Sequence, residues 1–339
     1  MEVYFVIFLI SLYSLFAKKR EREITFIVWA LMFLTTILRA ETIGADTYVY
    51  INHFNEEYRP LEFLTNIIYA GILGRNLDSR WTLVIFGVIT YLPLYFIAKR
   101  FKVPLPYFLL FFFLYHHYSA GLNIMRNMAA TSLTVLGISY IYDKRLVKSL
   151  LFFVFVILGA GIHTSVYVFL PLYLLRYLKI TDRAAIVTTI IFSFLVMTKI
   201  ISVNDIFLKY VPELYEEYIW RVMSSINTTL FGFIIALIAL FAYSAIIGVL
   251  DKQKIPLYVI SIIAAYSFFG NDANVFRIFQ PLLMCRTIFI AKAANQLAIK
   301  DRLTSYQQLA IFYIVFFAIV TCYTGFANNK TLVPYRFFF

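Results

Sequence analysis

The sequence predicts an all-α, polytopic membrane protein with about twelve transmembrane or partial helices in a single integral membrane domain, residues 1–339. Of these 339 residues, 62% are hydrophobic and 14% are charged, whereas soluble domains have roughly 45–50% apolar and about 25% charged residues. Apolar runs near the length of a membrane-spanning helix, about 20 residues, recur along the chain. The 26 tyrosines and 36 phenylalanines also suit the aromatic belts of membrane interfaces.

The net charge of +12 does not indicate a nucleic-acid partner, because basic residues anchor the cytoplasmic loops of membrane proteins. Membrane lipids are the partners expected from this composition. Cys285 and Cys322 lie in separate apolar segments, so their spacing indicates neither a metal site nor a disulfide framework. The first apolar segment lacks a basic start and a small-residue cleavage site, so we expect it to be retained as a helix.

Twelve apolar segments are expected to be helical: 3–17, 24–38, 81–98, 103–119, 124–142, 149–161, 164–176, 184–202, 228–250, 256–270, 276–294 and 305–325. The run from 149 to 176 could be one long tilted helix or two short ones meeting near Gly159, Gly161 and His163. Its two flanks, "DKRLVK" and "RYLKITDR", are both basic and are therefore expected on the cytoplasmic side. This favours a hairpin that turns at 160–163.

The loops between these segments divide by charge. One side receives 18 Lys and Arg against 6 Asp and Glu, and the other, with loops 39–80 and 203–227, receives 8 against 12. Because cytoplasmic loops carry the excess of Lys and Arg, both chain termini and both long loops are expected outside the cytoplasm. Several polar sequences, including the 160–163 turn, then lie at one outward-facing leaflet.

Arg126 and Arg277 are expected about one turn inside their helices, near this same leaflet. Charges within membrane-spanning helices are costly and usually have a partner or a task. A guanidinium group binds phosphate through two parallel hydrogen bonds, so the pair could hold a lipid pyrophosphate. The alternatives are ion pairs with Asp46, Glu41 or Asp272, or side chains that reach back to the membrane interface.

Asp46 and His163 are the candidates for proton transfer. Asp46 follows a glycine in a loop, where aspartate is also common as a turn or capping residue. His163 has an ordinary pKa of about 6.5, which suits a proton acceptor, although a structural histidine would satisfy the same pattern. No Gly-rich phosphate loop and no paired-aspartate motif is present, and this argues against an enzyme that uses nucleotide sugars in the cytoplasm.

Several motifs occur in a fixed order along nearly the whole chain. They are "RAETIGADTYVY" (39–50), "RPLEFL" (59–64), "MRNMAA" (125–130), "HTS" (163–165), "FRIF" (276–279) and "VPYRF" (333–337). Together they resemble the motifs of the EpsG-like family of Wzy-type polysaccharide polymerases. In this chain "RPLEF" replaces the family's Glu-Pro pair, and the role of Glu62 is left open.

The resemblance implies a metal-independent glycosyltransferase, without a cofactor, whose GT-C-like membrane fold is related to that of lipid-linked-sugar transferases. Its substrates would be undecaprenyl-pyrophosphate-linked glycans, joined at the outer face of a bacterial inner membrane. A chain-length regulator protein is a candidate partner. His163 or Asp46 would be the base, and the substrate-binding residues would be Arg126, Arg277, Arg39, Tyr50, Ser165 and Arg336.

Two other functions fit parts of the pattern. A flippase or exporter also needs intramembrane arginines and broken helices, but no internal repeat is evident and the charged groups gather at one leaflet. A ligase would move the same donor to a different acceptor, and the sequence does not separate it from a polymerase.

Overall fold

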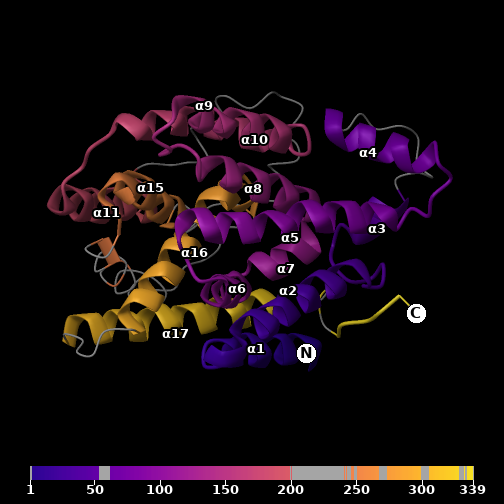
Figure 1. Cartoon of the computed structure of the whole chain (residues 1–339), viewed down its shortest axis with the longest axis horizontal. Helices are drawn as coiled ribbons and strands as arrows, with labels where there is room; N and C mark the ends of the chain where they lie inside the picture. The colour runs from indigo at the N-terminus through magenta and orange to yellow at the C-terminus, as the bar shows by residue number, and fades with distance from the viewer. Residues whose placement is uncertain are drawn as a thin grey trace. The chain divides into compact units, whose positions relative to one another are not determined.

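The computed structural model describes residues 2–52, 62–198, 200, 240, 242, 246–247, 250–266, 273–298, 305–327, 332 and 334–338. All regular elements within these residues are helical and no strand occurs among them (Figure 1), which confirms the all-α prediction. The helices are α1 Glu2–Ser14, η1 Lys18–Arg20, α2 Glu21–Ile37, α3 Thr47–Asn52, α4 Phe63–Leu73, α5 Trp81–Phe101, α6 Leu105–Leu114, α7 His117–Asn123, α8 Met125–Ile138, α9 Leu146–Ser149, α10 Leu151–Ala160, η3 Thr164–Tyr177, α11 Asp182–Met197, η6 Lys252–Lys254, α15 Ile255–Tyr266, α16 Ala273–Ala298 and α17 Ser305–Ala327.

The chain divides into two compact units: Met1–Tyr173 with Ala318–Phe339, and Leu174–Phe317. In the second unit, α15 packs against both α11 and α16. Asp251, just before η6, pairs there with Lys254 at 3.2 Å and with Lys292 at 3.0 Å. The expected loop 203–227 and nearly all of the expected segment 228–250 lie outside the described residues.

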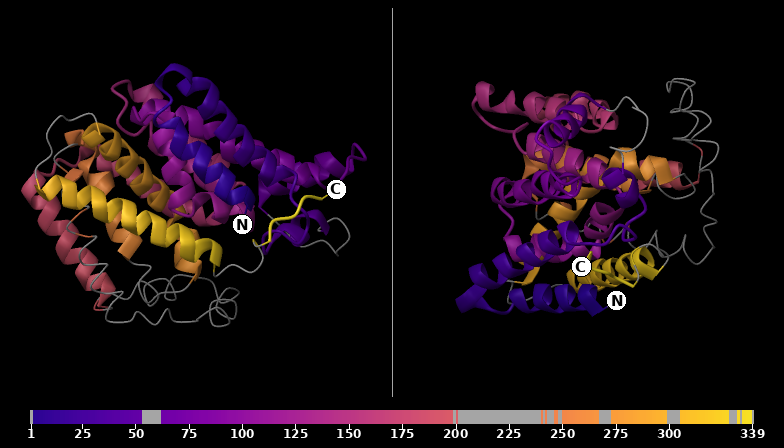
Figure 2. Two further views of the ribbon diagram at one scale, coloured as in Figure 1. Left: turned by 90° about the horizontal axis from the view of Figure 1, so that it is seen from below. Right: turned by 90° about the vertical axis from the view of Figure 1, so that its right-hand side faces the viewer.

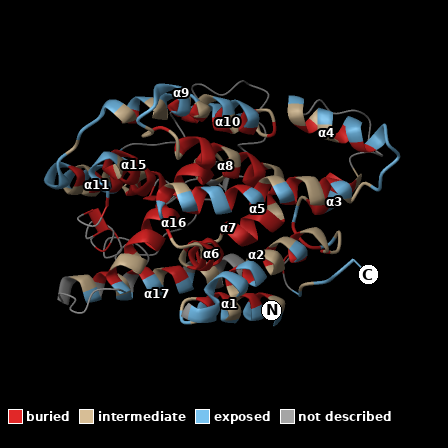
Figure 3. Ribbon diagram, in the orientation of Figure 1, coloured by how far each residue is buried: buried red, intermediate tan, exposed pale blue. Residues whose placement is uncertain are grey.

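Helix α8 is the centre of the first unit. Nearly all of its side chains are buried (Figure 3), because α5 and α10 both pack against it. The end of the chain runs beside the N-terminal helices (Figure 2), where the Tyr4 hydroxyl donates a hydrogen bond to the Leu332 carbonyl at 2.9 Å. The first unit therefore joins both ends of the sequence.

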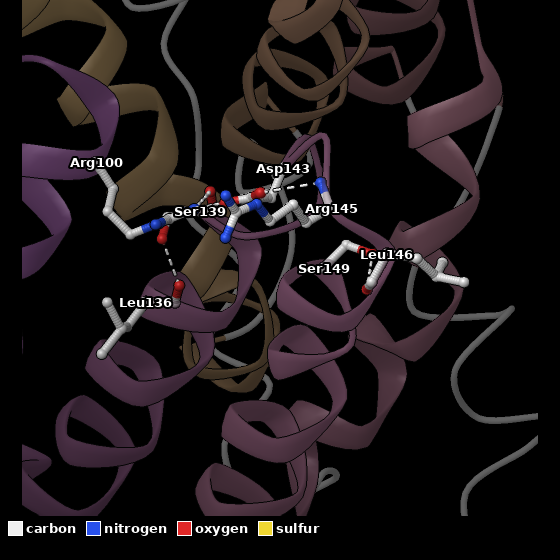
Figure 4. A network of polar contacts seen from close by, with 7 residues as sticks. All are labelled: Arg100, Leu136, Ser139, Asp143, Arg145, Leu146 and Ser149. Carbon is white, nitrogen blue, oxygen red and sulfur yellow. Dashed lines mark hydrogen bonds and ion pairs between the residues drawn. The ribbon is translucent and has the colours of Figure 1, made fainter.

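The C-terminal ends of α5 and α8 are tied together by a polar network around Arg100 (Figure 4). The Arg100 guanidinium donates to the Ser139 carbonyl at 3.4 Å and pairs with the Asp143 carboxylate at 3.1 Å. It also lies 3.5 Å from the centre of the Tyr140 ring, as in a cation–π contact. Since these two helix ends meet, α5 and α8 run in the same direction.

Two of the expected apolar segments are interrupted. Segment 103–119 breaks between α6 and α7, where His116 has a left-handed φ of 71°. Helix α10 ends at Ala160 and η3 starts at Thr164, so the 149–176 run is two helices separated by 161–163, as the basic flanks predicted. By contrast, the expected loop 39–80 contains two helices, α3 and α4, and that expectation needs correction.

One described helix, α5, is long and apolar enough to cross a membrane by itself. Several other apolar helices in the described ranges have 10–17 residues. At 1.5 Å per residue, a helix such as α6, with 10 residues, spans about half of a hydrocarbon core of about 30 Å. The expected number of twelve spans is therefore not confirmed. Large apolar side chains such as Phe16, Leu92 and Ile157 point outward with 74%, 51% and 54% exposure, which suits contact with lipid.

Candidate functional site

The site is built around the start of α8. Helix α7 ends at Asn123, Ile124 leaves the helical conformation with φ −119° and ψ 58°, and α8 begins at Met125. Arg126 is therefore the second residue of α8. The first backbone N–H groups of a helix lack partners within the helix and carry partial positive charge, so this position adds to the positive potential of the guanidinium.

The loop before α3 is pressed against this helix break. Gly44 has a left-handed φ of +87°, and a Cβ at this position would lie 1.9 Å from the Leu122 carbonyl oxygen. The next backbone N–H, of Ala45, donates to the Asn123 side-chain oxygen at 3.0 Å. Only glycine fits so close to α7, and this approach carries Asp46 and α3 to the start of α8.

Tyr50 connects α3 to α8. Its buried hydroxyl donates to the Asp46 carboxylate at 3.3 Å and lies within hydrogen-bonding reach of the Arg126 backbone. The Tyr69 hydroxyl, from α4, donates to the Tyr50 carbonyl at 3.2 Å. Asp46 and Tyr50, from the 39–50 motif, are thus brought together with Arg126, from the 125–130 motif.

Glu62 supplies the negative charge beside Arg126. It is the residue before α4, and its carboxylate does not cap that helix. Instead, one carboxylate oxygen lies 3.1 Å from Arg126 Nη2, with 14% and 17% of the two side chains exposed. The other oxygen accepts a hydrogen bond from the backbone N–H of Thr164 at 3.4 Å. Glu62 therefore connects α8 to the turn that carries His163.

The 161–163 turn caps α4. The Gly161 carbonyl accepts hydrogen bonds from the N–H groups of Leu64 at 2.8 Å and Thr65 at 3.3 Å, which are otherwise unpaired at a helix start. The Thr65 hydroxyl donates to the Ile162 carbonyl at 3.2 Å. A Cβ on Gly161 would lie 2.7 Å from Leu64 Cγ. The turn is fixed on α4 at a distance that glycine alone allows.

His163 is partly exposed at the end of this turn. Its Nδ1 lies 2.8 Å from the Ser165 hydroxyl. Its neighbour Thr164 holds Glu62, so the imidazole and the Arg126 guanidinium belong to one connected group of residues. The structure thus joins His163, Ser165, Arg126, Tyr50 and Asp46 through a continuous series of contacts.

Arg39 and Arg336 differ in exposure, and their binding of substrate stays a prediction. The Arg39 side chain is fully buried; it donates to the Thr47 hydroxyl at 2.9 Å and to the Thr36 carbonyl, and it lies 3.6 Å from the Met125 sulfur. Arg336 contributes its carbonyl, which accepts the Ala40 N–H at 2.8 Å, while its side chain is exposed. In this conformation Arg39 organises the loop before α3 and presents no N–H to solvent.

Arg277 lies on α16 in the second unit and is partly exposed. That it shares a pyrophosphate with Arg126 stays a prediction.

The EpsG family model matches residues 23–337, nearly the whole chain. The chain belongs to the EpsG family. This family is associated with polysaccharide polymerases, and membership indicates a membrane protein of polysaccharide biosynthesis. No curated protein and no solved structure gives a significant match.

In this EpsG-family chain, Glu62 is the residue whose importance the sequence left open. The ion-pair partners considered for Arg126 were Asp46, Glu41 and Asp272. The structure instead pairs Arg126 with Glu62 and pairs Glu41 with Arg80 at 3.4 Å, while position 272 lies outside the described residues. The apolar stretch after Glu62, "FLTNIIYAGIL", was a usable signal for a helix that begins at this acid.

Proposed function

We propose that the protein joins lipid-linked oligosaccharide repeat units into a surface polysaccharide at the outer face of a bacterial inner membrane. The donor is a growing glycan on undecaprenyl pyrophosphate, and the acceptor is a hydroxyl of the next lipid-linked unit. The observation that carries this proposal is the placement of Arg126 at the start of α8, connected through Glu62 to the turn with His163. These contacts bring a candidate phosphate-binding group and a candidate proton acceptor into one part of the first unit before substrate binds.

In the proposed reaction, the acceptor oxygen forms a bond to the anomeric carbon of the donor while the bond from that carbon to the pyrophosphate oxygen breaks. The electron pair leaves with the pyrophosphate, whose charge is stabilised by Arg126 and, in this proposal, by Arg277. The acceptor proton passes to His163. Asp46 is the second candidate for the base, and the hydrogen bond from Tyr50 orients its carboxylate.

The remaining predicted residues have supporting roles in this proposal. Ser165 holds the imidazole of His163 at its Nδ1, which orients the ring for proton transfer. Tyr50 fixes the start of α8 against Asp46. Arg39 does not contact the substrate in this scheme; it holds the loop that positions Asp46. No step in this scheme needs a metal ion.

The test is incubation of the purified protein with one lipid-linked repeat unit, followed by gel analysis of the products. A ladder of lengths identifies a polymerase, and transfer of single units to another acceptor identifies a ligase. Movement of the lipid-linked unit from one leaflet of a vesicle membrane to the other, without formation of a glycosidic bond, identifies a transporter. Arg126→Lys keeps the charge but loses the fork geometry, so the variant should insert normally and lose most of the ladder. A normal ladder would show that Arg126 does not bind the donor.

A further inference from the structure

The ion pair between Arg126 and Glu62 uses little of what a guanidinium offers. Arg126 Nη2 meets a single Glu62 oxygen at 3.1 Å, and this is its one acidic partner among the described residues. A guanidinium has N–H groups on two sides that can bind two oxygens at once. The pair is therefore weaker than a bidentate contact with the same group.

Glu62 is also held loosely on its other side. Its second oxygen accepts the Thr164 N–H at 3.4 Å, near the upper limit for a hydrogen bond. A pyrophosphate has several charged oxygens and can contact Arg126 bidentately, which favours it over the single contact of the carboxylate. Anion exchange at Arg126 thus replaces one contact by two.

The carboxylate that leaves Arg126 has a favourable place to go. Glu62 is the residue before α4 and has the extended backbone conformation of a helix cap, φ −62° and ψ 150°, without its side chain capping the helix. A carboxylate at a helix start is stabilised by the partial positive charge there. With Glu62 as the capping residue, Thr65 is the third residue of α4, and the N–H at that position is a usual donor to a capping side chain. In the structure this N–H donates to the Gly161 carbonyl at 3.3 Å.

We propose that Glu62 occupies the phosphate seat of Arg126 in the unloaded protein and is displaced when a pyrophosphate binds. The ion pair is then an exchangeable latch that keeps the partly exposed guanidinium neutralised between turnovers. This inference rests on the proposed function only in taking Arg126 as a pyrophosphate-binding group.

The test is a binding measurement on the full-length protein in detergent or nanodiscs. The probe is undecaprenyl pyrophosphate without sugars. Inorganic pyrophosphate and neutral undecaprenol are measured beside it, so that binding of the anionic group is distinguished from binding of the lipid. Glu62→Gln keeps the shape and removes the competing charge. It should bind undecaprenyl pyrophosphate roughly 10- to 100-fold more tightly, the range for one charge-assisted hydrogen bond that no longer has to be broken. Inorganic pyrophosphate should compete with undecaprenyl pyrophosphate for the site. The affinity for undecaprenol should be the same in Glu62→Gln and in the wild type.

Glu41→Gln is the matched control, because it removes the comparable pair with Arg80, at 3.4 Å, without touching Arg126. Its affinity should equal that of the wild type. If Glu62→Gln does not accumulate, Glu62→Asp retracts the carboxylate by one methylene and should also tighten binding. Unchanged or weaker binding in the Glu62 variants overturns the latch.

Arg126→Gln separates the two ideas. If it leaves probe binding unchanged, Arg126 is not the seat, and both the latch and the donor role of Arg126 are wrong. If it weakens binding while the Glu62 variants do not tighten it, only the latch is wrong. Tighter binding in Glu62→Gln, from a protein that forms no ladder, would retain the latch and reject the polymerase.

Discussion

Gly161→Ala is the sharpest perturbation that the site offers. The added Cβ would lie 2.7 Å from Leu64 Cγ, 2.9 Å from Leu64 Cδ1 and 3.3 Å from Leu64 Cβ. Ordinary carbon–carbon contacts are about 3.5–4.0 Å, so the turn has to move away from α4 or Leu64 has to change its rotamer. Movement of the turn would lengthen the 2.8 Å hydrogen bond from the Leu64 N–H to the Gly161 carbonyl, which caps α4.

The expected cost follows from the size of this overlap. Extra methyl groups in packed sites destabilise proteins by about 1–3 kcal/mol. For domains of about 150–250 residues, each kcal/mol lowers the melting temperature by about 2–4 °C, so we expect a loss of roughly 2–12 °C. Because the same turn positions His163 and Thr164, polymerisation should fall as well, at equal amounts of folded protein.

The assay is thermal unfolding of the detergent-solubilised protein, followed by size-exclusion chromatography with a fluorescent reporter. Gly71→Ala is the matched control: it lies on α4 itself, and a Cβ there meets nothing within 4 Å. It should be neutral or stabilising, because alanine is the better helix former by about 1 kcal/mol.

Leu64→Ala is the second arm, because it removes the two closest atoms of the clash. The double variant Gly161→Ala with Leu64→Ala should lose less stability than the sum of the single variants, as expected for two residues in contact. The close packing of the turn on α4 would be refuted if Gly161→Ala behaves like Gly71→Ala. Strict additivity in the double variant would refute Leu64 as the obstructing residue.

Three other predictions concern the base, the topology and the opposite end of the bundle. If His163 accepts the acceptor proton, His163→Ala, His163→Asn and His163→Gln should all reduce ladder formation by about 10²–10⁴-fold, whereas recovery in the amide variants would show a structural role and favour Asp46. In a variant without native cysteines, Ala45→Cys should react with an impermeant thiol reagent added from outside, and Val147→Cys, at a position that is 78% exposed, should react only from inside; the reverse pattern rejects the predicted orientation. The hydrogen bond from Arg100 lowers the pKa of the Asp143 carboxyl below its ordinary value, about 3.9. The contribution of the Arg100–Asp143 pair to the free energy of unfolding is therefore complete above about pH 3.9 and is lost as pH falls through the lower folded-state pKa. The melting temperature of the wild type should fall between about pH 5 and 2 for this reason, and Asp143→Asn should remove that part of the fall.

The sequence predicted the helical elements well where apolar runs are long and bounded by charges. Helix α5 is the clearest example, because an apolar run of membrane-spanning length ends at the basic sequence "KRFK". The interruption at 161–163 was also predicted, since two basic flanks require an even number of crossings between them. Helix α4 was missed because its 11 residues are too few for a spanning segment, and a length criterion therefore assigns them to a loop.

The candidate site was predictable in its residue types but not in its pairings. Arg39 and Arg126 look alike in the sequence, each an arginine beside an apolar helix. Their surroundings differ because Arg39 turns into a group of neutral acceptors, where Thr47 and a backbone carbonyl satisfy it, whereas Arg126 stands at a helix start opposite a carboxylate. Which acid reaches Arg126 depends on where the 161–163 turn fixes α4, and that contact joins residues far apart in the chain. A guanidinium held by several fixed neutral groups has no charged partner to exchange, whereas one held by a single carboxylate can exchange it for a phosphate. Of these two arginines, Arg126 is therefore the one suited to binding and releasing a phosphate.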